Sequence, residues 1–259
     1  MSRSKTCTAL VLQVRQSGEE NREAVFLSRE EGILKATLFG GPKSKLRAYV
    51  SPFHEGILWY YEDPVRNTKK ITDFDVRHWR PALRESYSHL MAGSSLLEIV
   101  LASQGSGGPW QEAFSLLSET LETLSTIQEA GIPVIVTYFI WNWLKVLGLL
   151  PELERCQICA CNVRPDEVVW YSSLEQQAYC SSCGEPIQRT ERERLFPING
   201  GGRRWVSRIL ELPASQVERY RVDEHTLAQV QRLGTELLQQ ALTRRISFGD
   251  TLDSRRSNL

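Results

Sequence analysis

The sequence predicts an α+β protein with a small β-barrel at its N-terminus, an all-helical domain after it, and a four-cysteine metal module inserted in the helical domain. Strand-like segments separated by glycine-containing turns fill the first 80 residues, and the apolar pattern changes to a helical period near Pro81. Two Cys-x-x-Cys pairs follow further along the chain. The expected boundaries are 1–80 for the barrel, 81–150 and 200–248 for the helical domain, and 151–199 for the metal module.

The barrel prediction depends on five short segments that are apolar or β-branched and end at turn-forming residues. The third ends at Gly40-Gly41-Pro42, and the long, aromatic-rich fourth segment is interrupted by Pro52. Five such strands are typical of a Greek-key barrel of OB-fold size, although a small SH3-like barrel has a similar pattern. The expected strands are 7–14, 24–28, 33–39, 46–61 and 69–76.

Apolar residues spaced three and four apart predict the helices. The stretch 132–150 is hydrophobic enough to resemble a membrane span, but it contains Asn142 and Lys145 and has only the minimum spanning length. We therefore expect a buried central helix there. The N-terminus has no apolar signal segment, so the predicted location is cytoplasmic. The expected helices are 83–103, 110–127, 134–149, 203–212 and 223–245.

The 259-residue chain has a formal net charge of zero that conceals an uneven distribution. Residues 1–80 carry 14 basic and 10 acidic side chains (+4), and residues 201–259 carry 10 and 7 (+3). The middle is acidic, with −4 over 81–150 and −3 over 151–200. This distribution permits nucleic-acid contact on one surface, while the neutral total argues against tight non-specific binding at high salt.

The two Cys-x-x-Cys pairs, Cys156/Cys159 and Cys180/Cys183, are separated by 20 residues. Each pair can face one metal ion, and together they complete a tetrahedron that leaves no position for water, as in structural zinc sites. Disulfides are the competing interpretation, but adjacent Cys-x-x-Cys pairs are poor structural disulfides. Cys161 follows the first pair and could replace a neighbour, although we interpret it as a spare thiol. The sequence predicts one structural Zn²⁺ on the four paired cysteines.

A basic segment free of acidic residues extends from 32 to 54. Alternation along the strand 33–39 places Lys35 opposite a face of apolar side chains, and the following loop projects further lysines. Such side chains suit phosphate contact, with nearby aromatic rings available for base stacking. The alternative is a solvated strand face above an aromatic core, where we expect most of those rings. The candidate DNA-binding residues are Lys35, Lys43, Lys45 and Arg47.

No catalytic residues are predicted. The four histidines are scattered without metal-site spacing, and no nucleophile elbow, metalloprotease motif or dinucleotide fingerprint occurs in the sequence. The segment Gly-Pro-Lys-Ser at 41–44 is not a P-loop, because Pro42 removes a backbone N–H and the first glycine is missing. A function based on binding surfaces is therefore favoured over an enzymatic one.

The chain resembles the RecO family of bacterial recombination mediators in the order of its modules and in two specific stretches. The first is GEENREAVFLSREEGILKATLFGGPKSKL, residues 18–46, and the second is YFIWNWLKVLGLLPELERCQICA, residues 138–160, with the second cysteine pair after it. The resemblance implies an N-terminal OB-fold, an all-helical domain and a zinc-binding insertion that many members possess. It also implies a non-enzymatic, nucleoid-associated DNA repair protein.

Members of that family bind single- and double-stranded DNA, anneal complementary strands, and act with RecR to help RecA displace single-strand binding protein. The resemblance further implies contact between the helical domain and the C-terminal tail of single-strand binding protein, with RecA an indirect partner and no membrane involved. This chain departs from the family in lacking strong positive charge, and its C-terminal segment ISFGDTLDSRRSNL is mixed. DNA affinity is therefore expected to be modest or dependent on partners.

Two hypotheses of other classes remain open at the level of the sequence. The first is a zinc-ribbon adaptor that binds proteins and never contacts nucleic acid, which predicts no salt-sensitive DNA binding. The second is a thiol-dependent oxidoreductase, which requires titratable free thiols in the native protein. The doubled cysteine pair and the missing βαβ context disfavour this redox function.

Overall fold

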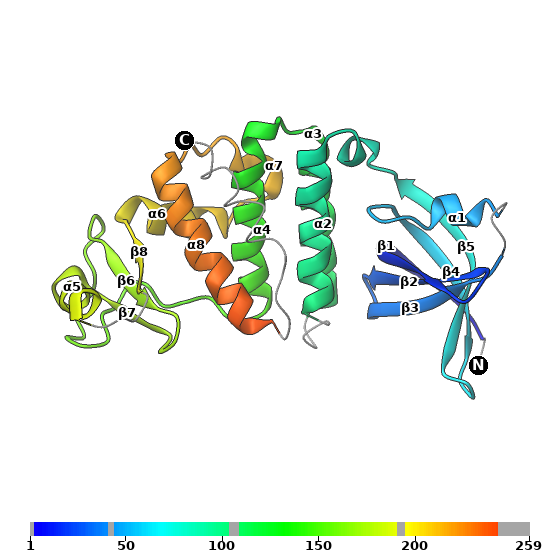
Figure 1. Ribbon diagram of the computed structural model, residues 1–259, viewed down its shortest axis with the longest axis horizontal. Coiled ribbons are helices and arrows are strands. Elements are labelled where there is room, and N and C mark those ends of the chain that lie inside the picture. Colours follow the sequence, from blue (N-terminus) through cyan, green and yellow to red (C-terminus); the bar gives the residue numbers. More distant parts are fainter. Residues whose placement is uncertain (1–2, 41–43, 104–108, 191–194, 243–259) are drawn as a thin grey trace. The chain divides into compact units, whose positions relative to one another are not determined.

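The computed structural model describes residues 3–40, 44–103, 109–190 and 195–242. The chain divides into two compact units, Met1–Glu129 and Ala130–Leu259. The first contains a β-barrel and two long helices, and the second contains further helices and a small three-stranded sheet (Figure 1). The predicted fold class, an OB-like barrel followed by a helical region with a cysteine cluster, is confirmed.

The barrel closes in the strand order β1-β2-β3-β5-β4, with β4 pairing back to β1. The single parallel contact joins β3 to β5 at Thr37 and Lys70, and the other strand pairs are antiparallel. A closed Greek-key barrel of five strands is OB-like. The strands are β1 (Ser4–Ser17), β2 (Asn21–Ser28), β3 (Gly32–Leu38), β4 (Glu55–Asp63) and β5 (Thr68–His78).

Alternation along β3 follows the sequence prediction. Leu34, Ala36 and Leu38 are buried in the barrel, whereas Lys35 is exposed on its outer face. Closure also requires a close backbone approach at Gly56 of β4, where a Cβ atom would lie 2.0 Å from the carbonyl oxygen of Asp75. The barrel interior is filled by apolar side chains, including Val11, Phe26, Leu58, Ile71 and Phe74.

The predicted strand over 46–61 is wrong in its first half. The chain there forms a short helix, α1 (Leu46–Tyr49), before a turn that leads into β4. Leu46 and Val50 are four residues apart and both pack against the barrel core, which is a helical spacing. The turn places Phe53 at a φ of 72°, so the chain reverses before it enters the sheet.

Two long helices complete the first unit: α2 (Tyr87–Ala102) and α3 (Trp110–Thr126), preceded by the 3₁₀ turn η1 (Pro81–Arg84). Arg80 leads into this turn with a φ of 45° and is 4% exposed. Its guanidinium donates to the Glu55 carboxylate, the Phe53 carbonyl and the Ser118 hydroxyl. One buried arginine therefore ties β4 to α3.

The second unit is built around α4 (Ile132–Val146), which follows the 3₁₀ turn η2 (Glu129–Gly131) and packs against α8 (Glu224–Ala241). Gly234 of α8 lies beside Trp141, where a Cβ atom would come within 2.8 Å of the indole nitrogen. That indole nitrogen donates to the Val230 carbonyl at 3.1 Å. The remaining helices of this bundle are α6 (Gly200–Ile209) and α7 (Ala214–Val217).

The polar side chains of α4 are explained by this packing. Asn142 donates to the Tyr138 and Ile209 carbonyls, and the Lys145 ammonium donates to the Leu210 carbonyl at 2.9 Å. The Ile209 and Leu210 carbonyls are at the C-terminal end of α6, so these side chains satisfy backbone acceptors of a neighbouring helix as well as of α4. Within the described ranges, every helix is too short or too polar to cross a membrane.

The cysteine module contains a three-stranded sheet in the order β7-β6-β8 and one helix. Its elements are β6 (Val169–Ser172), β7 (Gln177–Tyr179), α5 (Ser181–Thr190) and β8 (Leu195–Ile198). The last strand leads directly into α6, whose N-cap Asn199 accepts from the Gly202 N–H at 2.7 Å. The module is therefore continuous with the bundle at its C-terminal end.

Candidate metal centre and basic surface

The four paired cysteines converge on one point, although they come from distant parts of the chain. Cys156 and Cys159 lie in the loop before β6, Cys180 follows β7, and Cys183 lies in the first turn of α5. Their sulfur atoms all lie within 4.8 Å of one another, and the Cys159 and Cys180 sulfurs are 3.8 Å apart. Thiolates about 2.3 Å from a tetrahedral ion are separated by about 3.8 Å. The cluster therefore fits a metal ion.

The backbone of the first pair forms a tight turn around its sulfurs. The Cys156 N–H donates to the Cys161 carbonyl at 3.0 Å, and the Gln157 N–H donates to the Ala178 carbonyl at 2.9 Å. Ala160 has a φ of 55°, in the left-handed region that favours glycine. The second of these bonds holds the first cysteine pair against β7, which leads to the second pair.

Hydrogen bonds from backbone N–H groups stabilise the thiolate forms of the cysteines in this turn. The Cys161 N–H, with the neighbouring thiols, lowers the pKa of Cys159 to about 6. Burial opposes ionisation of Cys156, but N–H groups of Cys159, Cys180 and Ile158 outweigh it, so the pKa of this thiol is lowered. Thiolates are the metal-binding form of cysteine. The turn thus stabilises the ligand state of both side chains.

The second pair is held by its own packing. Gly184 follows Cys183 in α5, and a Cβ atom there would lie 2.7 Å from the Trp170 side chain. The Ser181 N–H at the start of α5 donates to the Glu167 carboxylate at 3.0 Å. A hydrogen bond donated to Cys180 raises the pKa of Cys183 to about 12. A bound cation would displace this proton, as metal binding to thiols requires.

Cys161 lies close to the cluster without belonging to it. Its sulfur is 3.1 Å from that of Cys159, and the hydrogen bond between the two side chains raises the pKa of Cys161 to about 12. The separation is shorter than the edge of a thiolate tetrahedron. The metal-binding group among the described residues comprises the four predicted cysteines. The interpretation of Cys161 as the spare thiol agrees with this geometry.

Arg203 connects the cysteine module to the bundle. It is 4% exposed, forms an ion pair with Glu154 at 2.8 Å, and donates to the Arg164 and Glu167 carbonyls. Beside it, Gly200 approaches the Pro165 carbonyl so closely that a Cβ atom would lie 2.1 Å from that oxygen. The start of α6 is therefore fitted against the loop that precedes β6.

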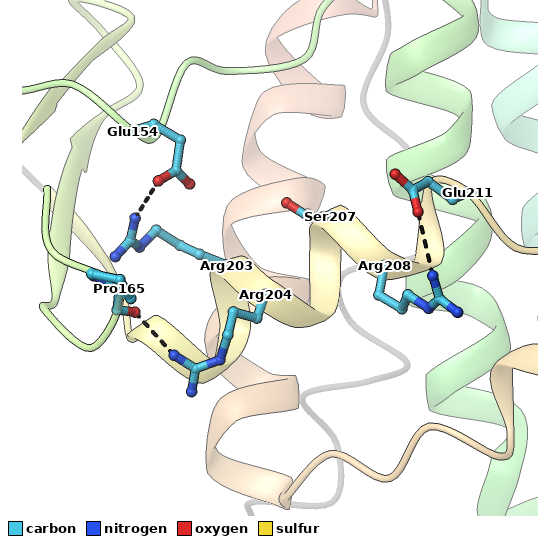
Figure 2. A pocket seen from close by; sticks show the side chains of 7 residues that line it. All are labelled: Glu154, Pro165, Arg203, Arg204, Ser207, Arg208 and Glu211. Atoms are coloured by element: carbon cyan, nitrogen blue, oxygen red, sulfur yellow. Dashed lines mark hydrogen bonds and ion pairs between the residues drawn. The ribbon is translucent and has the colours of Figure 1, made fainter. Parts of the chain in front are cut away.

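A cavity of about 400 Å³ opens along α6 at this joint (Figure 2). Its three arginines have internal acidic partners: Arg203 with Glu154, Arg204 with Asp166, and Arg208 with Glu211. The first two of these ion pairs link α6 to the loop before β6, and the third lies at the C-terminal end of α6. It is lined by Glu154, Pro165, Arg203, Arg204, Ser207, Arg208 and Glu211.

Three of the four predicted DNA-binding residues lie on the described surface of the barrel. Lys35 is exposed on β3, and Lys45 is exposed at the start of α1. Arg47 is half-buried and donates to the Glu20 carbonyl, so part of its guanidinium has an internal partner. Lys43 lies outside the described residues. Lys35 and Lys45 are thus the predicted cations that are both described and exposed.

The aromatic residues of this segment divide between the core and the surface. Phe53 and Tyr60 are buried, whereas Phe39, Tyr49 and Trp59 are exposed and Tyr61 is half-buried. The expectation that most of these rings lie in the core is therefore wrong. Sequence reasoning also missed Lys70, whose ammonium lies 5.0 Å above the Phe39 ring, and Trp79, which is exposed at the end of β5. Period-two alternation predicts which face a residue occupies, but the cross-strand neighbour of Phe39 depends on barrel closure.

Two family models of known proteins match successive parts of the chain. Residues 1–79 match the family model for the recombination protein O N-terminal region, and residues 84–247 match the model for its C-terminal region. A protein of Synechococcus sp. named DNA repair protein RecO is 28% identical, with 82% of this chain and 81% of the relative covered. A protein of the same name from Moorella thermoacetica is 24% identical, with 92% and 86% covered. This chain therefore belongs to the RecO family of DNA repair proteins.

Proposed function

We propose that this protein is a recombination mediator that binds single- and double-stranded DNA and anneals complementary strands. In this proposal it also acts with RecR to help load RecA onto DNA coated with single-strand binding protein. The observation that carries the proposal is the OB-like barrel with Lys35 and Lys45 exposed on its surface, in a chain whose two parts both match the family. DNA as the partner would place its action in the cytoplasm, at the nucleoid.

The proposed mechanism requires surfaces that bind DNA, and no covalent bond is made or broken in it. Two single strands repel each other through their phosphates, and cations that neutralise these phosphates release counterions and reduce the repulsion. Lys35 on β3 and Lys45 on α1 provide such charges, and Lys43 would add a third from the adjacent loop. Strands held together in this way pair faster, since base pairing then competes with less electrostatic repulsion. No residue is proposed as catalytic.

We further propose that the metal is a single structural Zn²⁺ bound by Cys156, Cys159, Cys180 and Cys183. Four thiolates are a typical zinc ligand set, and the sulfur separations fit a tetrahedron. When bound, the ion supplies a cross-link between the loop before β6 and the start of α5. The module is too small to form a large core of its own, so this cross-link would supply much of its stability.

The proposed protein partners are RecR, the C-terminal tail of single-strand binding protein, and RecA indirectly. Family membership supports these partners, with the tail expected on the helical region. Displacement of single-strand binding protein requires the mediator to act on coated DNA, so a contact with that protein would bring it to its substrate. The adaptor alternative retains the protein contacts and omits DNA binding.

The deciding experiment measures annealing of complementary oligonucleotides, bare and coated with single-strand binding protein, at about 50 and about 200 mM salt. The metal content of the same sample is measured in parallel. Faster annealing with about one zinc per chain is the expected result. Zinc without annealing or DNA binding at either salt concentration would favour the adaptor and contradict the mediator function.

A further inference from the structure

Two aromatic rings lie side by side on the surface of the first unit. Tyr49 ends α1 and is 36% exposed, and Trp79 follows β5 and is 45% exposed. Their ring centroids are 5.6 Å apart and their planes are nearly perpendicular, at 83°. Single exposed aromatic residues are common, but an exposed pair in contact forms an apolar patch of the kind that marks binding sites.

The pair is held in place from below by His54. This histidine is 3% exposed, and its ring centroid is 4.8 Å from that of Trp79. Its Nδ1 donates to the Tyr49 carbonyl at 2.8 Å, while its Nε2 accepts from the Arg84 guanidinium at 3.1 Å. One buried ring therefore supports both members of the pair, the tryptophan by contact and the tyrosine through its backbone.

The backbone that follows Trp79 is also fixed, because Arg80 is buried and its guanidinium is bound to Glu55 at 2.6 Å. A ligand that contacts Trp79 would thus meet a ring whose position is already set. Less ordering entropy is lost when a site is organised before binding. Buried supports beneath an exposed indole are the arrangement expected of a stacking platform.

Positive charge lies next to the two rings. Lys45 is exposed and is one helical turn before Tyr49, whose N–H lies 3.4 Å from the Lys45 carbonyl. Arg77 of β5 is two residues before Trp79 in the sequence, and its guanidinium pairs with Asp75 at 2.7 Å. An aromatic surface with an exposed ammonium one turn away is complementary to a base and its phosphate.

We propose that Trp79 and Tyr49 form a stacking site for an unpaired base of single-stranded DNA, with Lys45 contacting a phosphate of the same strand. This inference rests on the proposed DNA-binding function and assigns a site to it. In a duplex the faces of the bases are covered by their neighbours, so only an unpaired base can stack on Trp79. Phosphate contacts by lysine are available to both forms of DNA. The site therefore favours single strands.

The test compares Trp79→Ala with the wild-type full-length protein. Fluorescence anisotropy reports binding of a labelled oligo-dT of about 15 nucleotides and of a blunt-ended duplex of similar charge. The expected result is about a tenfold loss of oligo-dT affinity with duplex affinity unchanged within about twofold. Trp79→Phe should keep most of the oligo-dT affinity. Trp59→Ala, which removes another exposed tryptophan of the barrel, is the matched control and should bind as the wild type does.

Each other outcome overturns the inference. Equal oligo-dT affinity of Trp79→Ala and wild type would mean that the patch faces another partner, such as a protein segment. Equal loss on both DNA forms would indicate a role in barrel structure or phosphate contact, and circular dichroism would show whether the variant is folded. If the wild-type protein binds neither DNA, the proposed function fails, and the inference fails with it.

Discussion

The carboxylate of Glu55 and the guanidinium of Arg80 form an ion pair at 2.6 Å that is almost completely buried. Glu55 begins β4, and Arg80 lies between β5 and α2, so the pair fixes the exit of the barrel. The Ser118 hydroxyl of α3 donates to the same carboxylate oxygen at 2.6 Å. These contacts give the barrel and α3 one shared polar anchor.

Arg80→Ala should destabilise the first unit by about 3–5 kcal/mol, because it leaves the Glu55 carboxylate buried without its cation. Replacing both residues together, as Arg80→Met with Glu55→Gln, should cost less than the arginine change alone, since no buried charge then remains. Urea unfolding of the single and double variants measures both values. Arg77→Ala, which removes an exposed ion pair, is the control and should change stability by less than about 1 kcal/mol.

Substitution of Cys159 and substitution of Cys161 should have different effects on the metal content of the protein. Cys159→Ser removes one of the four convergent ligands, so the purified variant should lose most of its metal and unfold its module at lower temperature. Cys161→Ser leaves the group of four intact and should retain about one zinc per chain. Metal analysis with thermal unfolding of both variants checks this. Full metal in Cys159→Ser would show that Cys161 replaces it as a ligand.

Ala160→Gly should stabilise the cysteine module by up to about 1 kcal/mol. Ala160 occupies the left-handed region, which costs a residue with a Cβ roughly 1–2 kcal/mol, and glycine avoids most of this cost at the expense of more backbone entropy. The measurement is competition for zinc with a chelator, compared with the wild type. Ala178→Gly, at an extended position of β7, is the matched control and should weaken the module.

Substitution of the basic loop should weaken DNA binding without affecting folding. Lys43→Ala combined with Lys45→Ala is expected to reduce the slope of log affinity against log salt by about 2 for duplex DNA, one unit for each lost phosphate contact. Lys5→Ala combined with Lys69→Ala is the control of equal charge, because both of these ammonium groups are already paired with Glu62. DNA-binding affinities of both double variants, measured over a range of salt concentrations, give the two slopes to be compared. A similar slope change in both would mean that net charge alone matters.

The sequence predicted those features that depend on local spacing. Alternation along β3 places Lys35 outside, and the nearly continuous apolar stretch around Trp141 becomes the buried helix α4. The cysteine cluster was predictable because two Cys-x-x-Cys pairs at this separation are typical of four ligands around one metal ion. The helix α1 was missed because the aromatic residues of 46–61 resemble a strand, while its apolar positions Leu46 and Val50 pack with helical spacing.

Long-range partners could not be predicted in the same way. The hydrogen-bond partners of Arg80 include Glu55 and Ser118, which are 25 and 38 residues away in the sequence. Nothing in the sequence around Arg80 identifies these partners. The contact between Tyr49 and Trp79 likewise depends on where α1 packs against β5 (Figure 1). Such relationships follow from barrel closure, which fixes register across strands distant in sequence.

The stability of the first unit should fall in acid because of His54. Burial lowers the pKa of His54 below its ordinary value of 6.5, and the Arg84 guanidinium that donates to Nε2 also disfavours a second proton on the ring. On acidification, His54 of the unfolded chain is therefore protonated near pH 6.5, whereas His54 of the folded chain is still neutral there. The stability from neutral His54 is complete above pH 6.5 and is lost as the pH falls towards the lowered folded-state pKa.

Urea unfolding between about pH 8 and about pH 5 tests this, comparing the wild type with His54→Gln. The variant should be less stable at neutral pH, because its side chain fits the Tyr49 carbonyl and Arg84 less well. Its stability should nevertheless depend less on pH over the interval below 6.5, since the titrating ring is gone. Equal pH dependence in the two proteins would mean that other groups cause the acid sensitivity, and that the pKa of His54 does not differ between the folded and unfolded chains.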